Sequence, residues 1–139
     1  MSQWLSDMTS FCINERAARL IYFHPPGLSA YRDAVTQWLV KTKRYRDKEI
    51  FRWYTMSGLA DFLERREATS WKQHSISHDA VMMEMNNSVD LVNQAWLFDR
   101  KHYKKPIVKK GVASVFEDKD VWRVVAHKGN HLELNLRTY

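Results

Sequence analysis

The sequence predicts an α+β protein, with helices over residues 1–102 followed by a three-stranded antiparallel β-meander over residues 106–139. Two observations predict this class. Apolar residues recur at spacings of three and four through the first hundred positions, which is the period of helices with a buried face. Beyond Pro106 the apolar residues alternate instead, between short polar segments. A chain of 139 residues that is 45% hydrophobic is expected to form a single domain with a modest core.

The first two helices are expected over residues 2–23 and about 30–42. The single cysteine, Cys12, lies in the apolar pattern of the first helix and is expected to be a small core residue, not a nucleophile. The segment 24–27, His-Pro-Pro-Gly, should end that helix, because proline cannot continue helical geometry. Ser29 is then a candidate N-cap for the second helix.

Residues 55–78 have the pattern of two short helices joined by a tight polar link, the arrangement of a helix-turn-helix unit. Leu59 and Phe62 give the first of these helices an apolar face. Ser70 and Gln73 have the capping-box spacing that would start the second. A plain helical hairpin has the same pattern, and the link carries no glycine, so both arrangements are left open.

A long helix is expected from Ser75 or Ser77 to about Asp99. Its apolar residues are spaced by three and four in the manner of a heptad seam. Such a seam faces either the core of the domain or another copy of the chain. The residues predicted to form this oligomerisation surface are Met82, Met85, Val89, Val92 and Trp96.

The three strands of the meander are expected over Val112–Phe116, Val121–Ala126 and Leu132–Leu136. Charged residues 117–120 separate the first two, and the segment that contains Gly129-Asn130 separates the last two, because glycine and asparagine supply the positive φ of a turn. A sheet of three strands needs a cover for its apolar face, from the helices or from strands of other subunits.

The balance of charge predicts an anionic partner, since the net charge is +6 and the isoelectric point is about 9.5. The densest positive run is residues 41–48, and further cations follow in the predicted helix-turn-helix unit. Phosphate contact needs point charges and guanidinium forks, which both segments supply. The residues predicted to contact DNA are Lys41, Lys43, Arg44, Arg46, Arg65, Arg66, Lys72, Gln73 and His74.

No catalytic residue, metal ligand set or cofactor site is predicted. His74 and His78 are four residues apart, and His127 and His131 flank the last turn, but neither pair has a third ligand in view. Glu117-x-Lys119 suits a nuclease only if it lies on a rigid element, and a charged turn is not one. Two alternatives therefore stay open: a small nuclease or RNase-type toxin that uses the basic meander, and an inhibitor or adaptor that binds a protein.

Membrane insertion is not expected, because no apolar run has the length of a membrane span. A single cysteine cannot form an internal disulfide, which suits a reducing compartment. The expected location is therefore the cytoplasm.

One family resemblance gives the DNA prediction a biological setting. Residues 54–63, followed by Ser70-Trp71, resemble the helix-turn-helix segment of phage terminase small subunits, and residues 31–39 are similar to the aromatic-containing helix that precedes it. The resemblance covers about half of the chain through short motifs. It implies a non-enzymatic viral DNA-packaging protein in the cytoplasm of a host cell. Such a protein forms a homo-oligomeric ring, binds double-stranded DNA and regulates a large terminase subunit.

Overall fold

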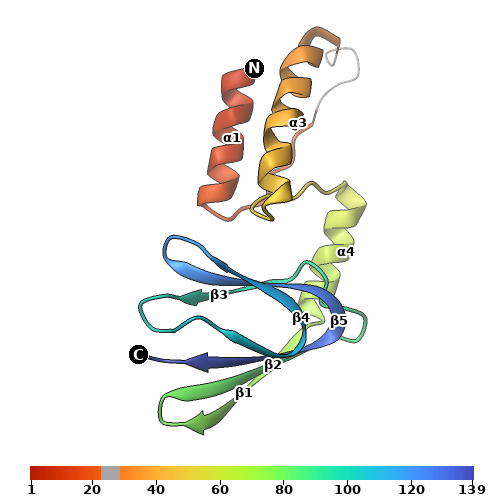
Figure 1. Ribbon diagram of the computed structural model, residues 1–139. Coiled ribbons are helices and arrows are strands. Elements are labelled where there is room, and N and C mark those ends of the chain that lie inside the picture. The colour runs from red at the N-terminus through yellow and green to blue at the C-terminus, as the bar shows by residue number, and fades with distance from the viewer. Residues whose placement is uncertain (23–28) are drawn as a thin grey trace. The chain divides into compact units, whose positions relative to one another are not determined.

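The computed structural model describes residues 1–22 and 29–139, and the chain divides into two compact units, Met1–Thr55 and Met56–Tyr139. We call the first the helical unit and the second the β unit (Figure 1). The fold is α+β, but the predicted meander, the long apolar helix and the helix-turn-helix unit are wrong. The sheet has five strands instead of three, and the long apolar helix is not formed. The predicted break at residues 24–27 lies outside the described residues.

The helical unit consists of helix α1 (Ser2–Asn14), the short 3-10 helix η1 (Ser29–Tyr31) and helix α3 (Arg32–Asp47). Helices α1 and α3 lie side by side and run in the same direction (Figure 1). Each contributes two buried residues four positions apart, which places them on one face of their helix. These four packing residues are Leu5, Thr9, Trp38 and Thr42.

Both predicted helix boundaries in this unit need correction. Helix α1 ends at Asn14 and not at residue 23, because Arg16 takes a left-handed φ of 50° and the Ala17 N–H closes back onto the Cys12 carbonyl. Helix α3 begins at Arg32, after the 3-10 turn, so Ser29 is not its N-cap. It also continues beyond the predicted end and includes most of the basic run.

The predicted helix-turn-helix unit at residues 55–78 is wrong. Its first half is helix α4 (Met56–Glu67), but its second half is strand β1 (Ser70–Ser77). Strand β1 pairs with the next strand from the Ser70–Asn86 pair to the Ser77–Ala80 pair, and this pairing takes the place of the helix expected from the capping box. Backbone groups that bond across a ladder cannot also form a helical turn.

The predicted long helix is also wrong, because residues 75–99 contain strand β2 (Ala80–Asn86), a loop and strand β3 (Ala95–Asp99). Without the helix there is no heptad seam. Met85 is fully buried in the core, whereas Val89 lies in the loop and is 66% exposed. The five residues of the predicted oligomerisation surface therefore lie on different elements: Met82 and Met85 on β2, Val89 and Val92 in the loop, and Trp96 on β3.

Strand β5 (Val121–Arg137) is the centre of the sheet, in which the order is β1-β2-β5-β3 and β4 (Ile107–Glu117) pairs with β5 separately. The first part of β5 pairs with β3 and its last part pairs with β2, while β4 pairs with both parts. The second and third strands of the predicted meander are thus one strand. The Gly129-Asn130 segment is a bend inside it and not a turn.

The bend in β5 is accommodated by a glycine on β4. Lys110 pairs with Glu133 and Val112 pairs with Lys128, so residues 129–132 of β5 lie opposite Gly111 alone. Both Gly111 and Gly129 have a left-handed φ, of 90° and 87°. A Cβ atom added to Gly111 would lie 2.6 Å from the His131 carbonyl oxygen, whereas one added to Gly129 would meet nothing within 4 Å.

The core of the β unit lies on one face of this bent sheet. Alternate residues of β5 point into it, as the period of a strand requires. Helix α4 contributes no buried residue, so the sheet and its loop supply the apolar core themselves. The buried residues of this core are Met85, Leu91, Phe98, Trp122, Val124, Ala126, Leu132, Leu134 and Leu136.

The two glycines give a matched test of the bend. Gly111→Ala should lower the free energy of unfolding by about 3 kcal/mol or more, because left-handed strain is added to a backbone clash. Gly129→Ala adds the strain alone and should cost about 1 kcal/mol. Urea unfolding of both variants measures the difference. Equal losses in the free energy of unfolding would show that the close approach of β4 to β5 does not exclude a side chain at residue 111.

Candidate functional site

The residues predicted to contact DNA fall on three elements in two units. Lys41, Lys43, Arg44 and Arg46 lie on α3 of the helical unit, Arg65 and Arg66 lie on α4, and Lys72, Gln73 and His74 lie on β1 of the β unit. The four residues on α3 are the largest of these three groups. The others do not form the recognition helix that the sequence predicted.

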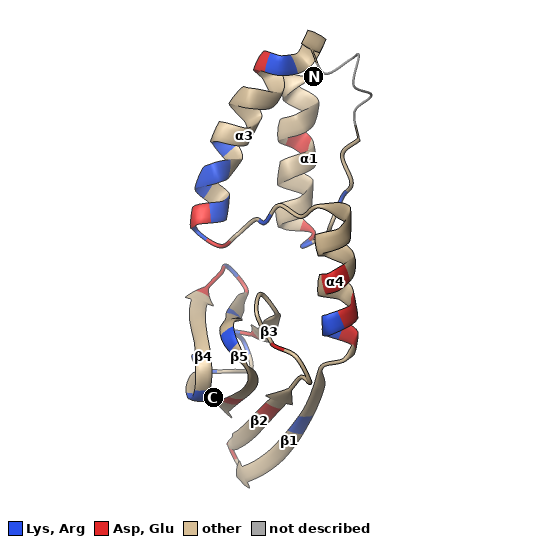
Figure 2. Cartoon of the chain, turned by 90° about the vertical axis from the view of Figure 1, so that its right-hand side faces the viewer, with Lys and Arg blue, Asp and Glu red and all other residues tan. Residues whose placement is uncertain are grey.

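The C-terminal half of α3 carries the densest run of Lys and Arg in the described part of the helical unit (Figure 2). Lys43 and Arg44 are exposed and have no ion pair with any described residue. Arg46 contacts the adjacent Asp47, with 3.0 Å between Nη2 and Oδ1. Residues 1–55 contain nine lysines and arginines against five carboxylates, a net charge of +4. The helical unit therefore presents unpaired positive charge at this end of α3.

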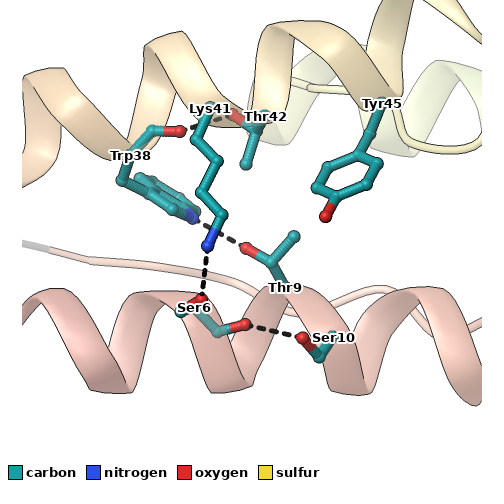
Figure 3. A pocket seen from close by; sticks show the side chains of 7 residues that line it. All are labelled: Ser6, Thr9, Ser10, Trp38, Lys41, Thr42 and Tyr45. Atoms are coloured by element: carbon teal, nitrogen blue, oxygen red, sulfur yellow. Dashed lines mark hydrogen bonds between the residues drawn. The ribbon is translucent and has the colours of Figure 1, made fainter.

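Lys41 differs from its neighbours because it takes part in the packing of the two helices. Its Nζ donates to Ser6 Oγ at 3.0 Å, and Figure 3 shows the side chain crossing from α3 to α1. Beside it, Trp38 Nε1 donates to the buried Thr9 hydroxyl at 2.7 Å, and that hydroxyl donates to the Leu5 carbonyl at 2.9 Å. The cavity among these side chains has a volume of about 30 Å³, which holds about one water molecule. This seam between the helices is a packing feature.

Arg65 is likewise held by contacts within its own unit. Its Nη1 donates to Asp90 Oδ1 at 2.7 Å, and its backbone carbonyl accepts from Asn87 Nδ2 at 2.6 Å. Both Arg65 and Asp90 are about two-thirds or more buried as side chains. The guanidinium therefore ties α4 to the loop between β2 and β3, and of the two arginines on α4 only Arg66 stays exposed.

Asn87 is the centre of the attachment of α4. In addition to its bond to Arg65, its side-chain amide donates to Thr69 Oγ1 at 2.8 Å, and its carbonyl oxygen accepts from the Val89 N–H at 2.8 Å. The Thr69 hydroxyl lies 2.8 Å from Gln94 Oε1. Asn87 and Gln94 are each only 5% exposed. Both polar atoms of the buried Asn87 amide are hydrogen-bonded, as burial requires, so Asn87 fixes where α4 ends.

One sequence signal could have located this loop. An Asx turn forms when the side chain of Asn or Asp accepts from the backbone N–H two residues on. Asn87 and Asp90 both do so, the second by accepting from the Val92 N–H at 2.9 Å. Two such residues three positions apart are typical of a loop and not of the middle of a helix.

A second cluster of charged groups lies on the outer face of the sheet, opposite the core. His131 Nε2 lies 2.7 Å from Glu133 Oε1, and its Nδ1 lies 2.6 Å from Asn86 Oδ1. Glu84 accepts from Asn86 Nδ2 at 2.9 Å and lies 3.7 Å from His74 Nε2. These hydrogen bonds, from His131 to Glu133 and from Asn86 to Glu84, hold the pKa of each carboxyl group below its ordinary value. Sequence reasoning missed this cluster, because only the strand register brings its residues together.

Glu117 and Lys119, the residues considered for nuclease chemistry, lie at the turn between β4 and β5, and contacts from Arg100 hold this turn. Arg100 pairs with the Glu117 carboxylate and donates to the carbonyls of Asp118 and Lys119 at 2.9 and 3.1 Å. Asp99 lies 3.1 Å from His102 Nδ1. Within residues 1–22 and 29–139, no three His, Cys, Asp or Glu side chains converge as metal ligands would.

Comparison of the chain with protein-family models, curated proteins and solved structures found no match. The segment that resembles terminase small subunits, residues 54–71, folds as one helix and the start of a strand. None of the helices in the described part of the chain is long and apolar enough to cross a membrane.

Removing the side chain of Asn87 should release α4. Asn87→Ala loses two donated and one accepted hydrogen bond, and it leaves the Arg65 carbonyl without this donor, so we expect the free energy of unfolding to fall by about 2–3 kcal/mol. Ser88→Ala, at the exposed next position, should change it by less than about 0.5 kcal/mol. Urea unfolding followed by circular dichroism measures both. Similar effects at the two positions would refute the anchoring role of Asn87.

Proposed function

We propose that the chain is a non-enzymatic, sequence-tolerant DNA-binding protein whose phosphate-contacting surface is the basic end of helix α3. The observation that carries the proposal is the group formed by Lys43, Arg44 and Lys48. All three are exposed, and none has an ion pair with a described residue. Unpaired cations can bind phosphates without first giving up a carboxylate partner, so their full charge is available to a nucleic acid.

The dimensions of this surface suit a nucleic-acid backbone. Residues 43–48 span about 7.5 Å of helix axis, and a DNA duplex presents one negative charge per about 1.7 Å of its length. Several phosphates therefore lie within reach of one helix end. Each neutralised phosphate releases counterions into solution, which is the main source of affinity in non-specific binding.

The lack of asparagine and glutamine between Lys43 and Lys48 supports sequence tolerance. Direct readout uses asparagine, glutamine or arginine placed in a groove by a recognition element. Between Lys43 and Lys48 the only such groups are arginines, and Gln73 lies on a strand of the other unit. The homo-oligomer, the large terminase partner and the packaging role stay predictions, and they no longer have a helical seam to support them.

Removing two of the unpaired charges tests the proposed surface. Lys43→Ala with Arg44→Ala should weaken binding to a short DNA duplex at low salt. It should also reduce the slope of log affinity against log salt by about 1.8, which is two phosphate contacts at about 0.9 each. Fluorescence anisotropy across a salt series measures both quantities.

The matched control is Lys105→Ala with Lys109→Ala, which removes the same charge from exposed positions of the β unit. Its affinity and slope should stay close to those of the unchanged protein. Equal losses in the two double variants would assign binding to net charge and not to α3. A wild-type chain that does not bind duplex DNA at low salt would refute the proposal, and binding to single-stranded RNA alone would replace it with RNA binding.

A further inference from the structure

We propose that the outer face of the sheet carries a pH-sensitive latch. In its closed state the His131 ring, protonated on both nitrogens, ties Glu133 of β5 to Asn86 of β2. Loss of one proton opens one of these two bonds. The latch uses only residues of the β unit and none of α3, so it does not depend on the proposed function.

The hydrogen-bond partners determine the protonation state of the closed latch. An ionised carboxylate only accepts, so the ring nitrogen 2.7 Å from Glu133 Oε1 must donate. The other nitrogen lies 2.6 Å from Asn86 Oδ1. Rotating the Asn86 side-chain amide by half a turn would lose the hydrogen bond that its Nδ2 donates to Glu84 Oε1 at 2.9 Å. Both ring nitrogens therefore face acceptors, and only the imidazolium satisfies both.

The charged groups around the ring favour this state. Glu133 on β5 and Glu84 on β2 lie beside it, the latter 3.8 Å from Nδ1. On β4, Lys110 Nζ lies 3.5 Å from Glu133 Oε1, and on β1 His74 lies 3.7 Å from Glu84. Each of the two carboxylates adjacent to the ring thus has one further basic neighbour. His131 is the only group that contacts both of them directly among the described residues.

The position of the latch gives its state a structural consequence. His131 lies in the bend of β5, and the adjacent Asn130 carbonyl accepts from the Asn87 N–H at 2.9 Å. The Gly129 carbonyl accepts from the Leu91 N–H at 2.8 Å. Asn87 also holds the end of α4. Opening the latch therefore loosens the junction between the bend of β5 and the loop that anchors α4.

The effect of pH on the latch depends on two kinds of group, the carboxyl groups and the histidine ring. The pKa values of Glu84 and Glu133 are lowered, so both stay ionised below the usual range for a carboxyl group, and their contribution is lost only as pH falls through those lowered values. The latch is closed while both carboxylates are ionised and the ring carries both protons, and it opens when rising pH removes one ring proton.

Nuclear magnetic resonance of the wild-type protein tests the latch directly. Long-range proton–nitrogen correlation should show both His131 ring nitrogens protonated at the acidic end of a pH series in which the protein stays folded. As the ring loses a proton, hydrogen-exchange protection of the Asn87 backbone amide should fall by roughly three- to tenfold, the equivalent of one hydrogen bond, after correction for the intrinsic pH dependence of exchange.

Two variants complete the test. His131→Gln should show the reduced protection at every pH, whereas His78→Gln, in the exposed turn between β1 and β2, should keep the wild-type pH dependence. A neutral His131 ring at acidic pH in the wild-type protein would overturn the proposal even if the first variant does not fold. So would pH-dependent protection of Asn87 that persists in His131→Gln.

Discussion

The fold of the β unit depends on one close approach, between Gly111 of β4 and the bend of β5. Strand β5 has to pair with β3 along its first part and with β2 along its last part, and it can do so only by bending between them. The bend brings the His131 carbonyl to a position that a side chain at residue 111 would occupy. Because β2 and β3 follow the same edge of β5 on either side of this bend, the loop between them has to cross it. That loop is the one to which α4 is attached.

The hydrogen bonds that fix the end of helix α4 to this loop are polar contacts of two residues. No residue of α4 is fully buried, and these hydrogen bonds come from Arg65 and from Thr69, just beyond its end. Apolar packing tolerates small shifts, whereas hydrogen bonds fail once their distance and angle are lost. The helix should therefore detach from the β unit in one step, at a lower free energy than unfolding of the core. Its attachment and the core are separate sources of stability.

The sequence predicted those elements whose inward-facing apolar residues recur at the period of a helix or of a strand. The spacing of Leu59 and Phe62 located α4, and the alternation from Leu132 to Leu136 located the end of β5. Strand β1 was missed because all eight of its residues are exposed, so burial imposes no period on it. Strand β2 was read as helix because Met82, on the outer face, is as apolar as the core residues beside it. Of the site, the unpaired charge of Lys43 and Arg44 was visible in the sequence, but the pairing of Arg65 with Asp90 joins residues 25 positions apart and needed the fold.

The exposure of β1 has a consequence for how the protein behaves in a crowded solution. The strand pairs with β2 along one side, and an open edge of this kind is a template on which other chains can add strands and aggregate. Two features of β1 oppose this. The bulge between Ser75 and Ser77 disturbs the regular spacing that an added strand would need, and Lys72 places an exposed charge on this edge strand. Such a charge disfavours the addition of strands, whether or not Lys72 ever contacts DNA.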